Sequence, residues 1–123
     1  MKAIAYVELK DGQPIRIFRT VKSAMAYSAK IVTHPELKNR QVVPMARMDA
    51  VRAIRNKIFE MQGHRCLWCG EWLAKDTAQM HEQQPRGEGG EISLENSIVL
   101  CYDCHQGRKD SAHGNRRLHF GGK

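Results

Sequence analysis

The chain has 123 residues, a formal net charge of +7 and 41% hydrophobic residues, of which few are aromatic. This length suits one small domain or a domain with an appendage, and so modest a core benefits from a staple such as a structural metal. No run approaches the roughly 18 apolar residues of a membrane helix, and the N-terminal stretch lacks the apolar centre of a signal peptide. We therefore expect a cytoplasmic protein without a membrane partner, in which paired cysteines bind metal.

The positive charge is concentrated in the first half of the chain. Residues 1–60 hold 12 Lys or Arg against 5 Asp or Glu, whereas residues 61–123 hold 8 of each class. Basic chains favour the phosphates of nucleic acids, but many small proteins are basic for solubility alone. Charge by itself therefore leaves a nucleic-acid partner and a merely soluble surface equally open.

The N-terminal elements read as a hairpin followed by a helix. Residues 2–10 (KAIAYVELK) and 15–19 (IRIFR) alternate between apolar and polar side chains, and the turn-forming segment 11–14 (DGQP) separates them. Thr20 can cap the helix that follows, and residues 33–35 (THP) end it. Its apolar face is predicted to carry Val21, Ala24, Met25, Ser28, Ile31 and Val32. The unit resembles small DNA-reading modules attached to some phage and intron nucleases; alternatively, it only packs on the rest of the chain.

A second helix is predicted from Pro44 to Gly63. Proline suits the first turn of a helix, where its missing N–H has no partner, and glycine is a frequent stop. Apolar residues recur between them every three or four positions, at Met48, Val51, Ile54, Ile58 and Met61. The same helix carries a basic set that is either a solvated face or a phosphate contact: Arg47, Arg52, Arg55 and Lys57.

The C-terminal half alternates short apolar runs with a glycine-rich loop. Residues 77–81 (TAQMH) form a weak strand pattern and residues 97–101 (SIVLC) a stronger, β-branched one. The Gly89-Gly90 pair between them indicates a flexible turn, and a helix is expected to begin near Asp103. This order of strand, loop, strand and helix would allow His81 and His105 to converge on one cation.

All four cysteines lie in two CxxC pairs, Cys66 with Cys69 and Cys101 with Cys104. Two residues between ligands let a tight turn direct both sulfurs at one tetrahedral ion, with a Zn–S distance of about 2.3 Å. The pairs are 31 residues apart, which is longer than in a plain zinc ribbon. We predict a structural four-cysteine Zn²⁺ site that clamps the two ends of the intervening segment, because four unrelated buried thiols would not explain the pairing.

The segment from residue 63 to residue 114 resembles the HNH endonuclease family. The matching positions are His81, Glu82, Pro85, Arg86, Gly89, Gly90, Asn96, Cys101, Cys104 and His105. The resemblance implies an α+β fold with a ββα-metal (His-Me finger) core, and a phage or prophage origin. One position departs from the pattern: where the family usually has its catalytic His, just before the proline turn, this chain has Glu82.

The same resemblance implies metal-dependent hydrolysis of DNA phosphodiester bonds. His81 and His105 would hold the catalytic divalent cation, for which Mg²⁺, Mn²⁺, Ni²⁺, Co²⁺ and Zn²⁺ are candidates. Asn96 would position the loop, and Glu82 would be the general base or a further ligand. Arg86 would hold the scissile phosphate, and His113 would reach the metal or a phosphate. The basic tail offers further contacts to DNA through Arg108, Lys109, Arg116 and Arg117.

These inferences predict three parts: an appendage of residues 1–43 that can contact DNA, a connecting helix of residues 44–62, and a nuclease domain of residues 63–123. Because Glu82 replaces the usual base, two alternatives stay open. One is a zinc-stapled nucleic-acid-binding module that has lost catalysis. The other is a phage packaging accessory with weak or partner-assisted cleavage, for which terminase or portal proteins would be the partners.

Overall fold

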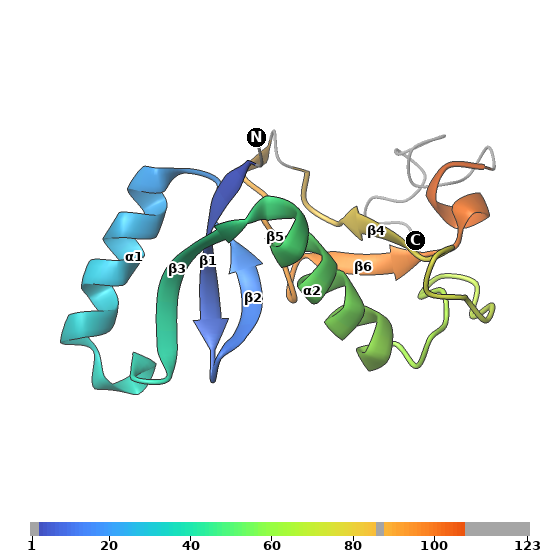
Figure 1. The fold of residues 1–123 in the computed structure, drawn as a ribbon. Coiled ribbons are helices and arrows are strands. Elements are labelled where there is room, and N and C mark those ends of the chain that lie inside the picture. Colours follow the sequence, from blue (N-terminus) through green and yellow to red (C-terminus); the bar gives the residue numbers. More distant parts are fainter. Residues whose placement is uncertain (1–2, 86–87, 108–123) are drawn as a thin grey trace. The chain divides into compact units, whose positions relative to one another are not determined.

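The computed structural model describes residues 3–85 and 88–107 (Figure 1). The fold is mixed α+β and is divided into two compact units, Met1–Arg55 with Glu82–Asn96, and Asn56–His81 with Ser97–Lys123. In chain order the elements are β1 (Ile4–Lys10), β2 (Gln13–Ile17), α1 (Val21–Thr33), the 3-10 turn η1 (Pro35–Leu37), β3 (Arg40–Ala46), α2 (Arg47–Met61), β4 (Gln79–Glu82), β5 (Ile92–Ser93), β6 (Ser97–Leu100) and the π-helical turn η3 (Asp103–Gly107).

The first unit is built on a four-stranded antiparallel sheet in the order β3-β1-β2-β5. The predicted hairpin is confirmed, and Lys10 lies opposite Gln13 across a two-residue turn. Asp11 and Gly12 both have positive φ angles, 51° and 81°, as the tightest hairpin turns require. The turn is therefore shorter than the predicted segment 11–14, and Pro14 lies inside β2.

Helix α1 begins and ends where the sequence predicts. The Thr20 side chain accepts a hydrogen bond from the backbone N–H of Ser23 at 3.0 Å, which is the expected cap. The predicted apolar face is mostly wrong, because Ala24 is the buried residue of the helix whereas Val32 is 85% exposed. The strands supply most of the core of this unit, so a short helix covering the sheet needs to bury only a narrow stripe.

The prediction that a helix begins at Pro44 is wrong. Residues 40–46 form β3, which pairs with β1 along its whole length and places Pro44 opposite Tyr6. A strand at the edge of a sheet has one unpaired side, so it tolerates a proline that a central strand would exclude. Helix α2 therefore begins at Arg47, and a boundary after residue 43 would cut through β3.

The inward face of α2 is rotated from the predicted one. Ile54 and Ile58 are buried as expected, but Met48 and Met61 are 72% and 64% exposed. Their places in the core are taken by two residues outside the predicted series, Ala50 and Phe59. The centre of the predicted series is therefore buried, whereas its two ends face solvent.

The second unit contains the two-stranded sheet of β4 and β6. Every residue of β6 is buried, in agreement with the apolar run in the sequence. Gln62 follows α2 and anchors the chain to this strand, since its Oε1 accepts from the Val99 N–H and its Nε2 donates to the Val99 carbonyl, both at 2.9 Å. Gly63 has a φ of 68° and follows the helix closely, as its role as a stop predicts. No helix among residues 3–85 and 88–107 is long and apolar enough to cross a membrane.

Candidate functional site

The sulfur atoms of the four cysteines form one cluster in the second unit. All four Sγ atoms lie within 4.8 Å of one another, and Cys69 Sγ is 3.8 Å from Cys101 Sγ. A tetrahedral ion with Zn–S bonds of about 2.3 Å has an S···S edge of about 3.8 Å. A disulfide needs about 2.05 Å, and none of the four cysteines forms one. The cluster therefore has the dimensions of a four-thiolate metal site.

Local hydrogen bonds shape the two turns that present these sulfurs. In the first turn the Gly70 N–H donates to the Cys66 carbonyl at 2.9 Å, and Gly70 adopts a φ of 78° that favours glycine. In the second turn the Cys104 N–H points at Cys101 Sγ at 3.4 Å, and the His105 N–H donates to the Cys101 carbonyl at 3.0 Å. Local hydrogen bonds thus close both CxxC turns.

The surroundings of Cys66 favour its ionised form. Burial of the side chain opposes ionisation, but hydrogen bonds with the backbone of Cys69, Cys101 and Trp68, and with the Cys69 side chain, outweigh it and lower the pKa of Cys66 to about 7. The thiolate is the form that binds metal. Four sulfurs in tetrahedral reach suit zinc or iron, so the chemistry of the donor set fits a metal and the predicted metal-binding cluster is confirmed in that general form.

His81 and His105 lie side by side next to this cluster in the second unit. His81 is in β4 and His105 is in η3, immediately after Cys104, and their ring centroids are 5.3 Å apart at an interplanar angle of 69°. Trp68 packs edge-on against His81 with ring centroids 6.3 Å apart. Two imidazole nitrogens bound to one ion at about 2.1 Å each lie at most about 4.2 Å apart. Rings at the observed separation can meet that condition, so the pair fits a divalent cation.

Gln79 adds a polar group that the sequence did not single out. Its Oε1 lies 2.8 Å from Nδ1 of His105 and accepts a second hydrogen bond from Nε2 of Gln106 at 3.2 Å. A signal for it did exist, because Gln79 precedes His81 by two residues in a strand and therefore shares its face.

Glu82, the last residue of β4, is half-buried. Its Oε2 is shielded from solvent and has no hydrogen-bond partner within the described part of the chain. A shielded carboxylate oxygen without a donor is costly, and accepting a proton from a water molecule or binding a cation would relieve that cost. Whether Glu82 is the general base or a metal ligand stays a prediction.

Asn96 is fully engaged in bracing the loop that precedes it. Its Oδ1 accepts from the Gln84 N–H at 2.8 Å, while its Nδ2 donates to the carbonyls of Gln84 and Glu91 at 3.0 and 2.8 Å. Its backbone carbonyl also accepts from the Gln83 N–H at 2.7 Å. Asn96 therefore holds the loop backbone at Gln84 and Glu91, and its predicted role in positioning a catalytic base stays a prediction.

The remaining predicted site residues fall outside the residues that the structure describes: Arg86, Arg108, Lys109, His113, Arg116 and Arg117. Their roles in binding phosphate, DNA or metal stay predictions.

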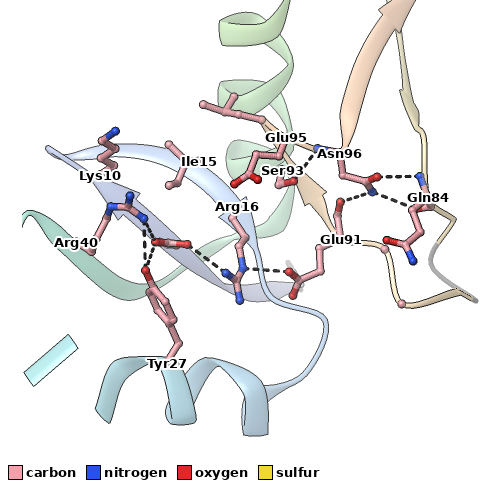
Figure 2. Close-up of a pocket in the computed structure, with 14 residues that line it drawn as sticks. Lys10, Ile15, Arg16, Tyr27, Arg40, Gln84, Glu91, Ser93, Glu95 and Asn96 are labelled. Atoms are coloured by element: carbon pink, nitrogen blue, oxygen red, sulfur yellow. Dashed lines mark hydrogen bonds and ion pairs between the residues drawn. The ribbon is translucent and has the colours of Figure 1, made fainter. Parts of the chain in front are cut away.

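A cavity of about 600 Å³ in the first unit is lined in part by an ion-pair cluster around Glu8 (Figure 2). Glu8 is 2% exposed and accepts from Arg40 Nη1 at 2.5 Å and from the Tyr27 hydroxyl at 2.6 Å, with Arg16 Nη1 at 3.5 Å. Arg16 also pairs with Glu91 at 3.0 Å. The alternation of residues 2–10 places Glu8 on the more polar face of the strand and does not mark it as buried, so the sequence analysis missed this cluster.

Comparison with known proteins leaves the family unassigned. No family model matches the chain, and no solved structure matches it. The protein named anaredoxin from Nostoc sp. (strain PCC 7120) is 28% identical over 54 residues, which covers 44% of this chain and 68% of that protein. The chain is thus similar to anaredoxin over less than half of its own length.

Proposed function

We propose that the chain is a metal-dependent endonuclease of the HNH type that hydrolyses phosphodiester bonds in DNA. The observation that carries the proposal is the pairing of His81 with His105 at a ring separation of 5.3 Å. These are the two residues that the resemblance assigns to the catalytic cation, and they come from elements far apart in the sequence. Their approach supports a shared ligand.

The order of elements gives further support. β4, the loop braced by Asn96, β6 and η3 follow one another as strand, loop, strand and helical turn. This is the order of a ββα-metal core. The cysteine cluster includes Cys104, the residue before His105, so a structural zinc there would fix the turn that presents the second histidine.

Each of these residues has its own role in the proposed reaction. The cation, when bound, stabilises the negative charge that develops on the phosphate and on the leaving oxygen. His81 and His105 hold it and orient it through their ring nitrogens. Glu82 takes the proton of the attacking water at a carboxylate oxygen, and Asn96 holds the loop that follows Glu82. Arg86 and the basic tail bind phosphates of the DNA.

Cleavage of supercoiled plasmid by the zinc-loaded protein, with and without Mg²⁺ or Mn²⁺, tests the proposal. We expect metal-dependent nicked or linear products that disappear in His81→Ala and His105→Ala, while both variants keep their zinc. His34→Ala is the matched control, because His34 caps α1 in the other unit. DNA binding without cleavage at any metal concentration would instead support a nucleic-acid-binding module or a packaging accessory whose partner supplies the chemistry.

A redox centre is a second candidate, favoured by the similarity to a protein whose name is that of a redox protein. Four thiolates in tetrahedral reach can hold iron as well as zinc. Metal analysis and a visible spectrum of protein purified under reducing, anaerobic conditions separate the two. Stoichiometric iron with a reversible, reducible absorption band would favour electron transfer, whereas colourless protein with one zinc would exclude it.

A further inference from the structure

Gln79 and His81 occupy the same face of β4. Successive side chains of a strand point to opposite faces, so residues two apart share one. His105 lies opposite this face in η3, where its ring is 5.3 Å from the ring of His81 and its Nδ1 is 2.8 Å from Oε1 of Gln79. The three side chains therefore form one continuous polar group within the second unit.

The contact between Gln79 and His105 fixes which ring nitrogen carries hydrogen. A carboxamide oxygen can only accept, and a neutral imidazole has one donor and one acceptor nitrogen. The oxygen of Gln79 also receives Nε2 of Gln106 at 3.2 Å. With Oε1 of Gln79 facing His105, a neutral ring donates from Nδ1 and carries its lone pair on Nε2.

We propose that Gln79 is a positioning residue that holds His105 in the Nδ1–H tautomer and so readies Nε2 as a ligand for the divalent cation. The inference rests on the proposed function for its purpose, but the tautomer itself can be measured without metal or DNA. Ligating histidines commonly donate their second ring nitrogen to an acceptor in this way, and loss of that acceptor typically weakens metal binding by about 10- to 100-fold.

The choice of Gln over Glu has a chemical consequence. A carboxylate at this position would accept the same hydrogen bond but would add a negative charge beside the ring and favour the imidazolium. The neutral amide orients the ring without that charge. Gln79→Glu should therefore keep the Nδ1–H tautomer, whereas Gln79→Leu, which has similar volume and no acceptor, should release it.

The test is a long-range ¹H–¹⁵N spectrum of zinc-loaded protein with labelled histidine, recorded without a second metal near pH 8.5, above the ordinary range of imidazole titration. The His105 signals are assigned by their loss in His105→Asn. Gln79→Leu and Gln79→Glu are compared with Gln41→Leu, which removes an exposed glutamine from strand β3. Calorimetric titration of the same proteins with Ni²⁺ gives the affinity of the second metal site.

We expect the Nδ1–H tautomer in the wild type, in Gln79→Glu and in Gln41→Leu. In Gln79→Leu we expect this tautomer to be lost and the affinity for Ni²⁺ to be at least about 10-fold weaker than in the wild type. An Nε2–H tautomer in the wild type, or an unchanged tautomer in Gln79→Leu, would overturn the inference. If Gln79→Leu does not retain zinc, Gln79→Ala provides the acceptor-free variant. Expected tautomers in all variants but no Ni²⁺ binding by the wild type would support the hydrogen bond and refute the metal site of the proposed function.

Discussion

The Asn96 side chain hydrogen-bonds both backbone polar groups of Gln84: its Oδ1 accepts from the Gln84 N–H at 2.8 Å, and its Nδ2 donates to the Gln84 carbonyl at 3.0 Å. This pairing brings the backbone of residue 84 against Gly90, where a Cβ would lie 1.7 Å from the Gln84 oxygen. Position 90 therefore requires glycine, because any side chain would collide with the backbone of Gln84. The loop between β4 and β5 thus depends on this close backbone contact as well as on the flexibility of glycine.

Gly90→Ala should disrupt this loop and lower the free energy of unfolding by more than about 2 kcal/mol, because backbone atoms must move to admit the methyl group. Gly89→Ala is the matched control: nothing lies within 4 Å of its Cβ, but its φ of 90° is unfavourable for alanine, a strain of about 1–2 kcal/mol. Urea unfolding measures both. Equal losses would show that the crowding at residue 90 is relieved at little cost.

Cys66→Ser should abolish stoichiometric zinc and lower the free energy of unfolding by several kcal/mol, since the binding energy of a structural metal contributes directly to folding. Zinc content by mass spectrometry and thermal unfolding check this. Tyr102→Ala changes an exposed residue between Cys101 and Cys104 and should leave both quantities unchanged. Wild-type protein without zinc or another bound metal would contradict a structural role for the cluster.

Glu82→Ala should fold, keep its zinc and bind DNA, but cleave about 100-fold more slowly or worse if Glu82 is the general base. Glu82→His should retain or raise activity, with a rate that falls below about pH 6.5 as imidazole protonates. If Glu82 is a ligand, excess Mn²⁺ should partly rescue the alanine variant. Glu88→Ala, an exposed loop carboxylate, is the control. Cleavage by Glu82→Ala at the wild-type rate at every metal concentration would exclude both roles.

Glu8→Gln should destabilise the first unit by about 1.5–3 kcal/mol, because it removes the buried carboxylate that pairs with Arg40 and that compensates Arg16 together with Glu91. Glu95→Gln, an exposed residue lining the same cavity, should change the free energy of unfolding by less than about 0.5 kcal/mol. Chemical denaturation provides the comparison. A small effect of Glu8→Gln would mean that Glu91 and solvent are sufficient to compensate the two guanidinium groups.

The predicted contribution of the N-terminal region to DNA affinity is best tested by charge substitution, because a cut after residue 43 divides β3. Lys22→Gln with Lys30→Gln removes two exposed charges of α1, and each lost phosphate contact should reduce the salt slope of log K by about 0.9. Lys75→Gln, exposed in the second unit, is the control. Fluorescence anisotropy at several salt concentrations gives the slopes, and an unchanged slope would assign α1 a packing role only.

The features predicted well are those that neighbouring residues determine. Thr20 caps a helix through an amide three residues away, Asp11 and Gly12 close a turn between adjacent strands, and each CxxC pair forms within four residues. Their geometry is fixed by short segments, so the sequence pattern is sufficient.

The features that were missed depend on partners far along the chain. Pro44 is compatible with a helix start until Tyr6 is known to pair with it, and the charge of Glu8 is tolerable in the core because Arg40 reaches it from 32 residues away. The role proposed for Gln79 likewise depends on its contact with His105, 26 residues later in the chain. Periodicity cannot reveal such contacts, so the ion-pair cluster and the neighbour of His105 could not be predicted from the sequence.

The two units are interleaved along the sequence. The chain passes from one to the other after Arg55, after His81 and after Asn96, so the first unit takes its strand β5 from a segment inserted within the second. A fragment that ends near residue 55 would lack that strand, and no single cut yields either unit whole. Neither unit can therefore be exchanged between proteins as one uninterrupted segment.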